Sequence, residues 1–269
     1  MGHGIAHAAA AAGFDTAMYD VSLAAVEKGR QRIEDIFRKG VELGKVAQAD
    51  ADAAMTRLSI SDSLEEVLTG TDFVIEAAPE RIDLKLHLIA EIDRHAPAHA
   101  IVTTNTSALS ITEMAGASTN PGRVAGMHFF NPVHRMTLVE IVRALESTPA
   151  TLDAVDAVSK RMGKQTVLVR ESPGFITTRV NASIGNEAFY MLMEGVASAR
   201  DIDKALKLGL NHPMGPFELV DLVGLDTRLS ILEYLHRSMG EKYRPCPLLA
   251  QYVKAGRLGR KAGRGVYDY

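Results

Sequence analysis

The stretch MGHGIAHAAAAAGFDTAMYD, residues 1–20, decides how the first part of this chain folds. It is typical of a glycine-bearing turn, then a helix of small residues, then a short extended segment that ends at Asp20. Ile5 and Ala8 fall on one helix face, where small neighbouring side chains permit close packing against a sheet. Gly13 is suited to end this helix, because glycine readily adopts the left-handed conformation common at that position.

This order matches the second half of a dinucleotide-binding βαβ unit, in which a G-x-G-x-x-G turn follows a strand and opens a helix. Gly2 fits the last glycine of that turn. Asp20 fits the acid that accepts hydrogen bonds from a ribose diol and repels a 2′-phosphate. A helix cap or a turn aspartate is the alternative for Asp20, but the preceding helix and strand favour the cofactor contact.

Strands and helices alternate up to about residue 171. Near-continuous apolar runs such as FVIEAA (73–78) and AIVTT (100–104) are typical of strands buried on both faces. The alternation predicts a mainly parallel, doubly wound α/β sheet. Besides the strand within residues 1–20, strands are expected at 57–61, 72–78, 100–107, 124–132, 138–142 and 165–171, and helices at 22–44 and 81–93.

The pattern becomes helical after Ile176, with no further predicted strand. An apolar stripe repeats every four residues from Val180 to Leu192. Further helical segments, separated by Pro and Gly, are expected at 201–210, 216–239 and 247–256. We therefore predict two domains, residues 1–172 and residues 173–269.

Composition excludes several classes of protein. The 269 residues are 46% apolar and 23% charged, which is ordinary for a globular chain with a sizeable core. A net charge of −3 argues against a general nucleic-acid binder. The single cysteine, Cys246, excludes an internal disulfide and fits a reducing compartment. No apolar run is long enough to span a membrane, and no signal peptide is visible.

The residues with the clearest chemistry lie in MHFFNPVHRMTLVEIV, residues 127–142. His128 ends an apolar strand, and Glu140 interrupts the apolar segment LVEIV. A carboxylate in such a segment is costly unless it is paired, and a carboxylate-oriented histidine is a common general acid/base. The alternative is a solvated histidine and a glutamate at a sheet edge. His134 is expected in a solvated position outside the site.

Polar residues also follow two other predicted strands. Glu80 follows VIEAAP, and Asn105, Thr106 and Ser107 follow IVTT. Ligands of open α/β sheets bind at the carboxyl ends of the strands, so these side chains are candidate ligand contacts. Ordinary turn and capping roles suit the same residue types equally well. The basic segment 256–269 is expected to be a solvated tail unless it meets an acidic ligand.

Several motifs, in this order, resemble the 3-hydroxyacyl-CoA dehydrogenases, in particular the short-chain 3-hydroxybutyryl-CoA dehydrogenases: EAAPE, NTSALSI, HFFNPV, PGFI, NHPMGPFEL and GRKAGRGVYDY. The resemblance covers essentially the whole chain. It implies a Rossmann-like NAD-binding domain followed by an all-α domain for substrate binding and dimerisation. It also implies NAD as cofactor, an acyl-CoA thioester as substrate, and a cytoplasmic homodimer of fatty-acid β-oxidation without a metal, a nucleic-acid partner or a membrane.

The resemblance also implies roles for single residues. His128 takes the proton of the 3-hydroxyl group, Glu140 holds His128, and Ser107 hydrogen-bonds the substrate oxygen. Thr178 stands where many relatives carry an asparagine, and a threonine still makes one hydrogen bond with a shorter reach. The implied cofactor contacts are Gly2, Asp20, Glu80, Lys85, Asn105, Asn131 and Lys261, and the implied substrate contacts are Ser107, Asn131 and Thr178.

One departure from the family concerns the opening turn. Met1 aligns with the methionine inside the family's GAGTMG, so the resemblance places a strand and two glycines upstream of Met1. We expect residues 1–269 alone to leave strand edges unpaired and to bind NAD weakly. A non-catalytic acyl-CoA-binding or dimerisation module is therefore the alternative to an enzyme. A dicarboxylic or aromatic-degradation 3-hydroxyacyl-CoA is the alternative substrate.

Overall fold

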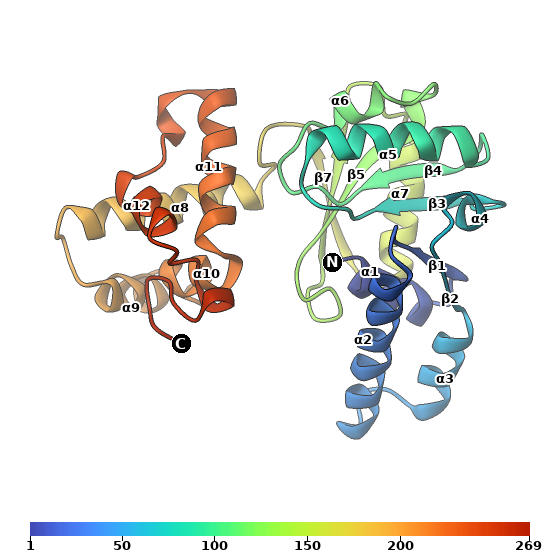
Figure 1. The fold of residues 1–269 in the computed structure, drawn as a ribbon, viewed down its shortest axis with the longest axis horizontal. Helices are drawn as coiled ribbons and strands as arrows, with labels where there is room; N and C mark the ends of the chain where they lie inside the picture. Colours follow the sequence, from blue (N-terminus) through green and yellow to red (C-terminus); the bar gives the residue numbers. More distant parts are fainter. The chain divides into compact units, whose positions relative to one another are not determined.

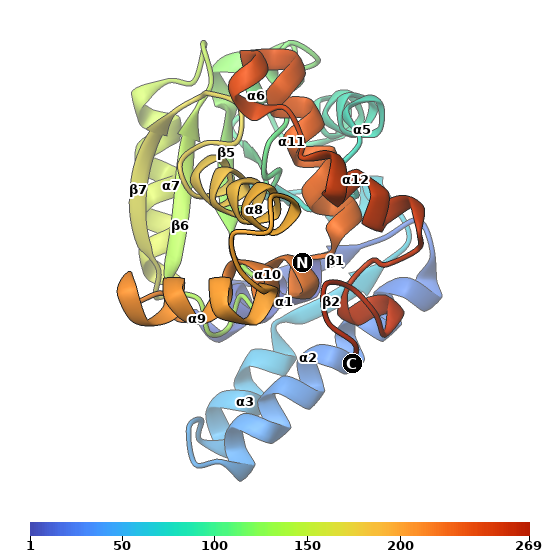
Figure 2. The same cartoon turned by 90° about the vertical axis from the view of Figure 1, so that its left-hand side faces the viewer.

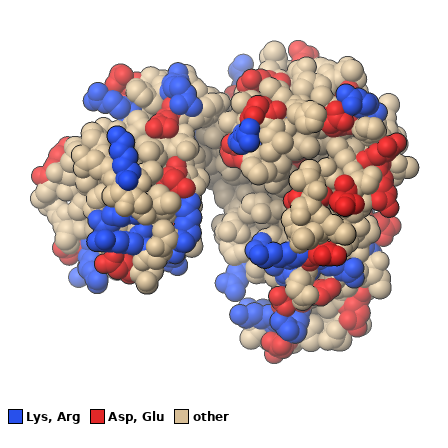
Figure 3. Space-filling view, viewed as in Figure 1, with Lys and Arg blue, Asp and Glu red and all other residues tan.

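The computed structural model describes residues 1–269. The chain forms two compact units, Met1–Glu171 and Ser172–Tyr269 (Figure 1). The sequence predicts a boundary between residues 172 and 173. None of the helices has both the length and the apolar character needed to cross a lipid bilayer. Acidic and basic side chains are interspersed over the visible face of each unit (Figure 3), as the small net charge leads one to expect.

The first unit is an α/β structure with two separate sheets. The smaller sheet pairs β1 (Thr16–Tyr19) with β2 (Leu58–Ser61). The larger sheet has the order β3 (Phe73–Glu76), β4 (Ile101–Thr104), β5 (Val124–Phe129), β6 (Leu138–Arg143), β7 (Gln165–Arg170). All neighbouring strands are parallel except β5 and β6, which are antiparallel. The predicted doubly wound α/β fold is confirmed, and β1 and β3 are edge strands of their sheets.

Seven α-helices accompany these strands: α1 (Gly2–Ala11), α2 (Leu23–Glu42), α3 (Gln48–Thr56), α4 (Leu64–Leu68), α5 (Ile82–His95), α6 (Ile111–Ala115) and α7 (Pro149–Arg161). The sequence pattern predicts α1, α2 and α5. The other four have too weak an apolar periodicity to predict, because α4 and α6 are five residues long, alanine supplies the buried residues of α3, and threonine and serine are among the buried residues of α7.

Helix α1 packs on both sides within the first unit (Figure 1). Ile5 and Ala8 belong to the same apolar cluster as the buried residues of β5 and β6, which confirms the predicted helix face. Ala6 and Ala10 pack instead with the buried residues of α2 and α3. Gly13 has φ +84° just after the helix, so its lack of a Cβ lets the chain turn there as predicted.

The second unit consists of helices α8 (Thr177–Met193), α9 (Ala199–Gly209), α10 (Pro216–Val223), α11 (Leu225–Met239) and α12 (Pro247–Lys254), with short 3₁₀ turns (Figure 2). Gly224, with φ +106°, divides the predicted helical segment 216–239 into α10 and α11. Phe189 of α8 and Phe217 of α10 meet edge to face in the core, with ring centroids 5.2 Å apart.

Two buried aspartates hold the C-terminal segment of the second unit. Asp221 accepts hydrogen bonds from the backbone N–H groups of Val266 and Tyr267, at 2.8 and 2.9 Å. Asp203 accepts one from the Tyr267 hydroxyl at 2.7 Å and one from the N–H of Phe217, at 2.8 Å. Burial raises the pKa of Asp203. The expectation of a solvated tail is therefore wrong for this backbone, although Arg260, Lys261 and Arg264 are exposed.

One histidine of the first unit is buried without a hydrogen-bond partner for its Nδ1 atom. The ring centroid of His7 lies 4.2 Å from that of Phe37 and 6.0 Å from that of His134. Burial, assisted by the charges of His134, Lys164 and His3, lowers the pKa of His7 to about 4. The folded protein therefore favours the neutral imidazole at this position.

Because this folded-state pKa lies below that of an unfolded histidine, the unfolded chain binds the proton more readily. Stability is therefore lost as the pH falls from about 6.5 toward about 4. We expect His7→Gln to remove about 2 kcal/mol of the wild-type loss between pH 7 and about pH 4.5. Urea unfolding at the two pH values measures this difference. His87→Gln, at an exposed position, should keep the wild-type loss, and the same behaviour in His7→Gln contradicts the prediction.

Candidate active site

His128 and Glu140 face each other across the antiparallel pair of β5 and β6. His128 Nδ1 lies 2.7 Å from Glu140 Oε2, and the two residues are 4% and 0% exposed. Burying a carboxylate completely costs free energy unless it accepts a hydrogen bond from a charged or polar group, and the imidazole N–H donates one here. The structure brings together the pair that the sequence predicts and places both residues away from solvent.

Ser107 extends this pair into a row of three. Its Oγ lies 3.1 Å from His128 Nε2. Ser107 follows β4 and His128 lies near the end of β5, and these parallel neighbours end at the same edge of the sheet. With Nδ1–H donating to Glu140, the Nε2 atom is left to share a proton with a hydroxyl group. Ser107 is partly exposed, so the row opens toward solvent at the serine.

Asn105 holds the ends of three strands together. Its Oδ1 accepts a hydrogen bond from the N–H of Phe129 at 2.8 Å, and its own N–H donates to the carbonyl of Glu76 at 2.8 Å. Asn105 thereby fixes the backbone next to His128. Asn131 is exposed just beyond β5. The cofactor contacts expected of Asn105 and Asn131 stay predictions.

Glu80 and Lys85 lie in a hydrogen-bonded network beside this row. Glu80 accepts hydrogen bonds from the turn that carries Ser107, and Lys85 is 1% exposed and paired with Glu76. Their cofactor contacts also stay predictions. Sequence reasoning missed Glu76, although it interrupts the apolar run FVIEAA in the same way that Glu140 interrupts LVEIV.

The start of α1 and the end of β1 fit a dinucleotide. Helix α1 has no side-chain cap and no acidic residue in its first turn, so its first N–H groups suit an anion such as a pyrophosphate. A Cβ on Gly2 would meet only Ala77, at 3.9 Å, which leaves the approach to the helix open. Asp20 is exposed just after β1, where its carboxylate can accept hydrogen bonds from a ribose diol.

Two predicted contacts belong to the second unit. Thr178 lies in the first turn of α8 and is partly buried. The Lys261 ammonium lies 2.6 Å from both carboxylate oxygens of Asp226, with about half of its side chain exposed. The substrate and cofactor contacts expected of these two residues stay predictions.

Comparison with known proteins gives the same family for both units. Residues 1–172 match the NAD-binding domain of 3-hydroxyacyl-CoA dehydrogenase, and residues 174–269 match the C-terminal domain. The 3-hydroxybutyryl-CoA dehydrogenase of Bradyrhizobium diazoefficiens is 43% identical over 270 residues, which cover 100% of this chain and 92% of the relative. The 3-hydroxybutyryl-CoA dehydrogenase of Clostridioides difficile is 40% identical over 270 residues, which cover 100% of this chain and 96% of the relative.

Similarity extends to solved structures. The crystal structure of (S)-3-hydroxybutyryl-CoA dehydrogenase from Ralstonia eutropha is similar with a TM-score of 0.96 and 44% identity, covering 100% of this chain and 95% of that one. Both domain matches, the full-length relatives and the fold lead to one conclusion. This chain belongs to the 3-hydroxyacyl-CoA dehydrogenase family and is an NAD-dependent dehydrogenase.

Proposed function

We propose that this enzyme interconverts (S)-3-hydroxybutyryl-CoA and acetoacetyl-CoA, with His128 as its general acid/base. The observation that carries the proposal is the row of Ser107, His128 and Glu140, joined at 3.1 and 2.7 Å. A histidine held by a buried carboxylate, with its second nitrogen directed at a hydroxyl group, is suited to exchange a proton with an alcohol. The names of full-length bacterial relatives support the four-carbon substrate.

In the direction of oxidation, Nε2 of His128 takes the proton of the substrate's 3-hydroxyl group. Glu140 holds the imidazole through Nδ1–H and stabilises the imidazolium that forms. Ser107 donates a hydrogen bond to the substrate oxygen and keeps it within reach of Nε2. When bound, NAD supplies the acceptor for the hydride that leaves C3. In the reverse direction, the imidazolium of His128 returns the proton to the ketone oxygen.

Asp20 and the start of α1 would hold the cofactor. The carboxylate of Asp20 accepts hydrogen bonds from the adenosine ribose and repels a 2′-phosphate, which favours NAD over NADP. The first N–H groups of α1, beginning at Gly2, receive the pyrophosphate. The non-catalytic alternative gives the buried pair of His128 and Glu140 no role, although burying it is costly.

Replacement of the proposed base is the direct test of this function. We expect His128→Gln to lower kcat by about 10²–10⁴-fold, because the variant loses its general acid/base, while the Kd for NADH stays within about twofold. Oxidation of NADH by acetoacetyl-CoA measures kcat, and NADH fluorescence measures Kd. His134→Gln, in the exposed loop after β5, is the matched control and should retain activity. Wild-type kcat in His128→Gln contradicts the proposal.

The choice of acyl group is tested separately. We expect kcat/KM to be highest for acetoacetyl-CoA and lower for a longer 3-oxoacyl-CoA and for one with a terminal carboxylate. Each change of one methylene in an apolar site is worth about 10–200-fold in discrimination. Steady-state assays with the three thioesters at saturating NADH give the order. A preference for the dicarboxylic thioester assigns the enzyme to the alternative substrate class.

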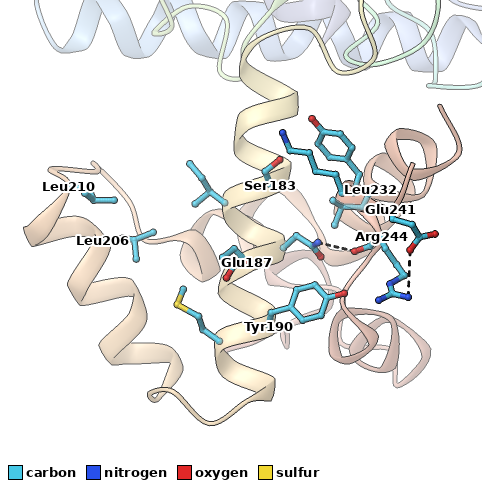
Figure 4. Close-up of a pocket in the computed structure, with 13 residues that line it drawn as sticks. Ser183, Glu187, Tyr190, Leu206, Leu210, Leu232, Glu241 and Arg244 are labelled. Atoms are coloured by element: carbon cyan, nitrogen blue, oxygen red, sulfur yellow. Dashed lines mark hydrogen bonds and ion pairs between the residues drawn. The ribbon is translucent and has the colours of Figure 1, made fainter. Parts of the chain in front are cut away.

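We also infer that two copies associate through the second unit. A pocket of about 560 Å³ lies beside α8 (Figure 4). The residues that line it include apolar side chains of α8 and α9. Leu210, which lines it, is 66% exposed, and Val180, on the same helix as the lining Ile184, is 54% exposed. Apolar surface of this kind is typical of an interface, and a twofold dimer covers it on both copies at once.

A charge within this surface is expected to separate the copies. We expect the wild-type protein to have twice the chain mass of 29.1 kDa in solution and Leu210→Glu to shift toward the single-chain mass. A carboxylate at an apolar contact loses its hydration without a partner. Light scattering after gel filtration measures the masses. Leu145→Glu, at a 73% exposed position of the first unit, should leave the wild-type mass unchanged; an unchanged mass for Leu210→Glu places the contact elsewhere.

A further inference from the structure

We propose that Glu80 is a positioning residue that fixes Ser107 against His128 and acts on the reaction through this turn. The inference rests on the proposed function of the row formed by Ser107, His128 and Glu140. It differs from the cofactor contact that family resemblance implies for Glu80, because it assigns the carboxylate to the protein's own backbone.

One carboxylate oxygen of Glu80 accepts three hydrogen bonds from the turn around Ser107. Oε1 accepts from the Thr106 hydroxyl at 2.5 Å, from the Ser107 N–H at 2.8 Å and from the Ala108 N–H at 3.3 Å. The Thr106 oxygen in turn accepts from the N–H of Leu109 at 3.0 Å. Hydrogen bonds to an ionised acceptor are stronger than hydrogen bonds between neutral groups. The backbone on both sides of Ser107 is therefore tied to a single side chain.

A buried lysine supports Glu80 from the opposite side. The Lys85 ammonium lies 3.7 Å from Glu80 Oε2, 2.8 and 2.9 Å from the two carboxylate oxygens of Glu76, and 3.0 Å from the carbonyl of Ala78. Glu76 and the carbonyl provide three acceptors for the three N–H donors of the ammonium. Glu76 also accepts from the Thr104 hydroxyl at 2.6 Å, which links the ends of β3 and β4.

This anchoring bears on the position of the Ser107 hydroxyl. Ser107 follows the end of β4, is partly exposed, and lies in a turn that Glu80 holds through three hydrogen bonds. Loss of the shared acceptor leaves those donors without their common partner, and the turn is free to relax. A displacement of about 1 Å of a reacting or orienting group costs up to about 10²-fold in rate. Glu80 is thus expected to act on kcat rather than on cofactor affinity.

Two conservative variants distinguish the effect of the length of the Glu80 side chain from the effect of its charge. Glu80→Gln keeps the side-chain length and an acceptor oxygen, whereas Glu80→Asp keeps the charge and shortens the side chain by one methylene. Positioning depends on reach, so we expect kcat within about threefold of wild type for Glu80→Gln and about 10–100-fold lower for Glu80→Asp. NADH Kd should stay within about twofold for both. The opposite order of kcat, or a change confined to NADH Kd, overturns the proposal.

Coupling to Ser107 is tested with a double-mutant cycle. If Glu80 acts through the serine, Glu80→Asp has no further effect on kcat in a Ser107→Ala enzyme. The same fold loss in both backgrounds overturns the positioning role while leaving the proposed function intact. Wild-type kcat in Ser107→Ala shows instead that the row itself has been misassigned, so the two failures are distinguishable.

The folding control uses the same change at an unrelated site. Glu65→Asp, exposed on α4, should match wild type in kcat, NADH Kd and melting temperature. Glu80→Asp should match it in far-ultraviolet circular dichroism and differ in kcat. If Glu80→Asp does not fold, Glu80→Ala, which removes the acceptor oxygen, replaces it: a kcat at least about tenfold below that of Glu80→Gln supports positioning through the acceptor oxygen, and equal kcat values for the two variants overturn it.

Discussion

The burial of one carboxylate constrains this whole site. Glu140 lies inside the larger sheet with no exposed surface, and only a close hydrogen-bonding partner makes that position tolerable. His128 is that partner because β5 and β6 run antiparallel with the two residues directly opposed. A slip of one residue in this pairing would turn the two side chains to opposite faces of the sheet. Strand register therefore determines the contact between His128 and Glu140, and the neighbouring parallel strand brings Ser107 next to His128.

A second buried carboxylate in the same sheet has a different kind of partner. Glu76, near the end of β3, is paired with Lys85, whose three N–H donors all have acceptors within the protein. Glu140 is paired with His128, which keeps a second nitrogen for Ser107. In both pairs, the partner offsets the free-energy cost of burying a carboxylate. The first pair joins parts of the scaffold, and the second leaves the Nε2 atom to which the proposed function assigns proton exchange.

Much of this arrangement follows from local sequence, and the rest depends on distant contacts. Apolar strands and a carboxylate within one of them were enough to predict His128 with Glu140. The antiparallel direction of β6 follows from its short connection to β5, because parallel neighbours need a crossover of a dozen or more residues, but the alternation of strands and helices alone did not indicate it. Lys85 occupies the same helix face as the buried Ile89 and Ile92, so its spacing marks it as inward-facing. Its partner Glu76 comes from another element, which helix periodicity does not identify.

The row of serine, histidine and glutamate has the order of groups found in acyl-transfer triads. Acyl transfer also requires donors that stabilise the tetrahedral oxyanion, and backbone N–H groups beside the nucleophile commonly provide them. The N–H groups of Ser107 and Ala108 instead donate to the Glu80 carboxylate, a negative charge that disfavours a second one beside it. This turn therefore offers the serine no oxyanion hole. With the proposed thioester substrate, the serine hydroxyl would then lie beside the thioester without cleaving its carbon–sulfur bond.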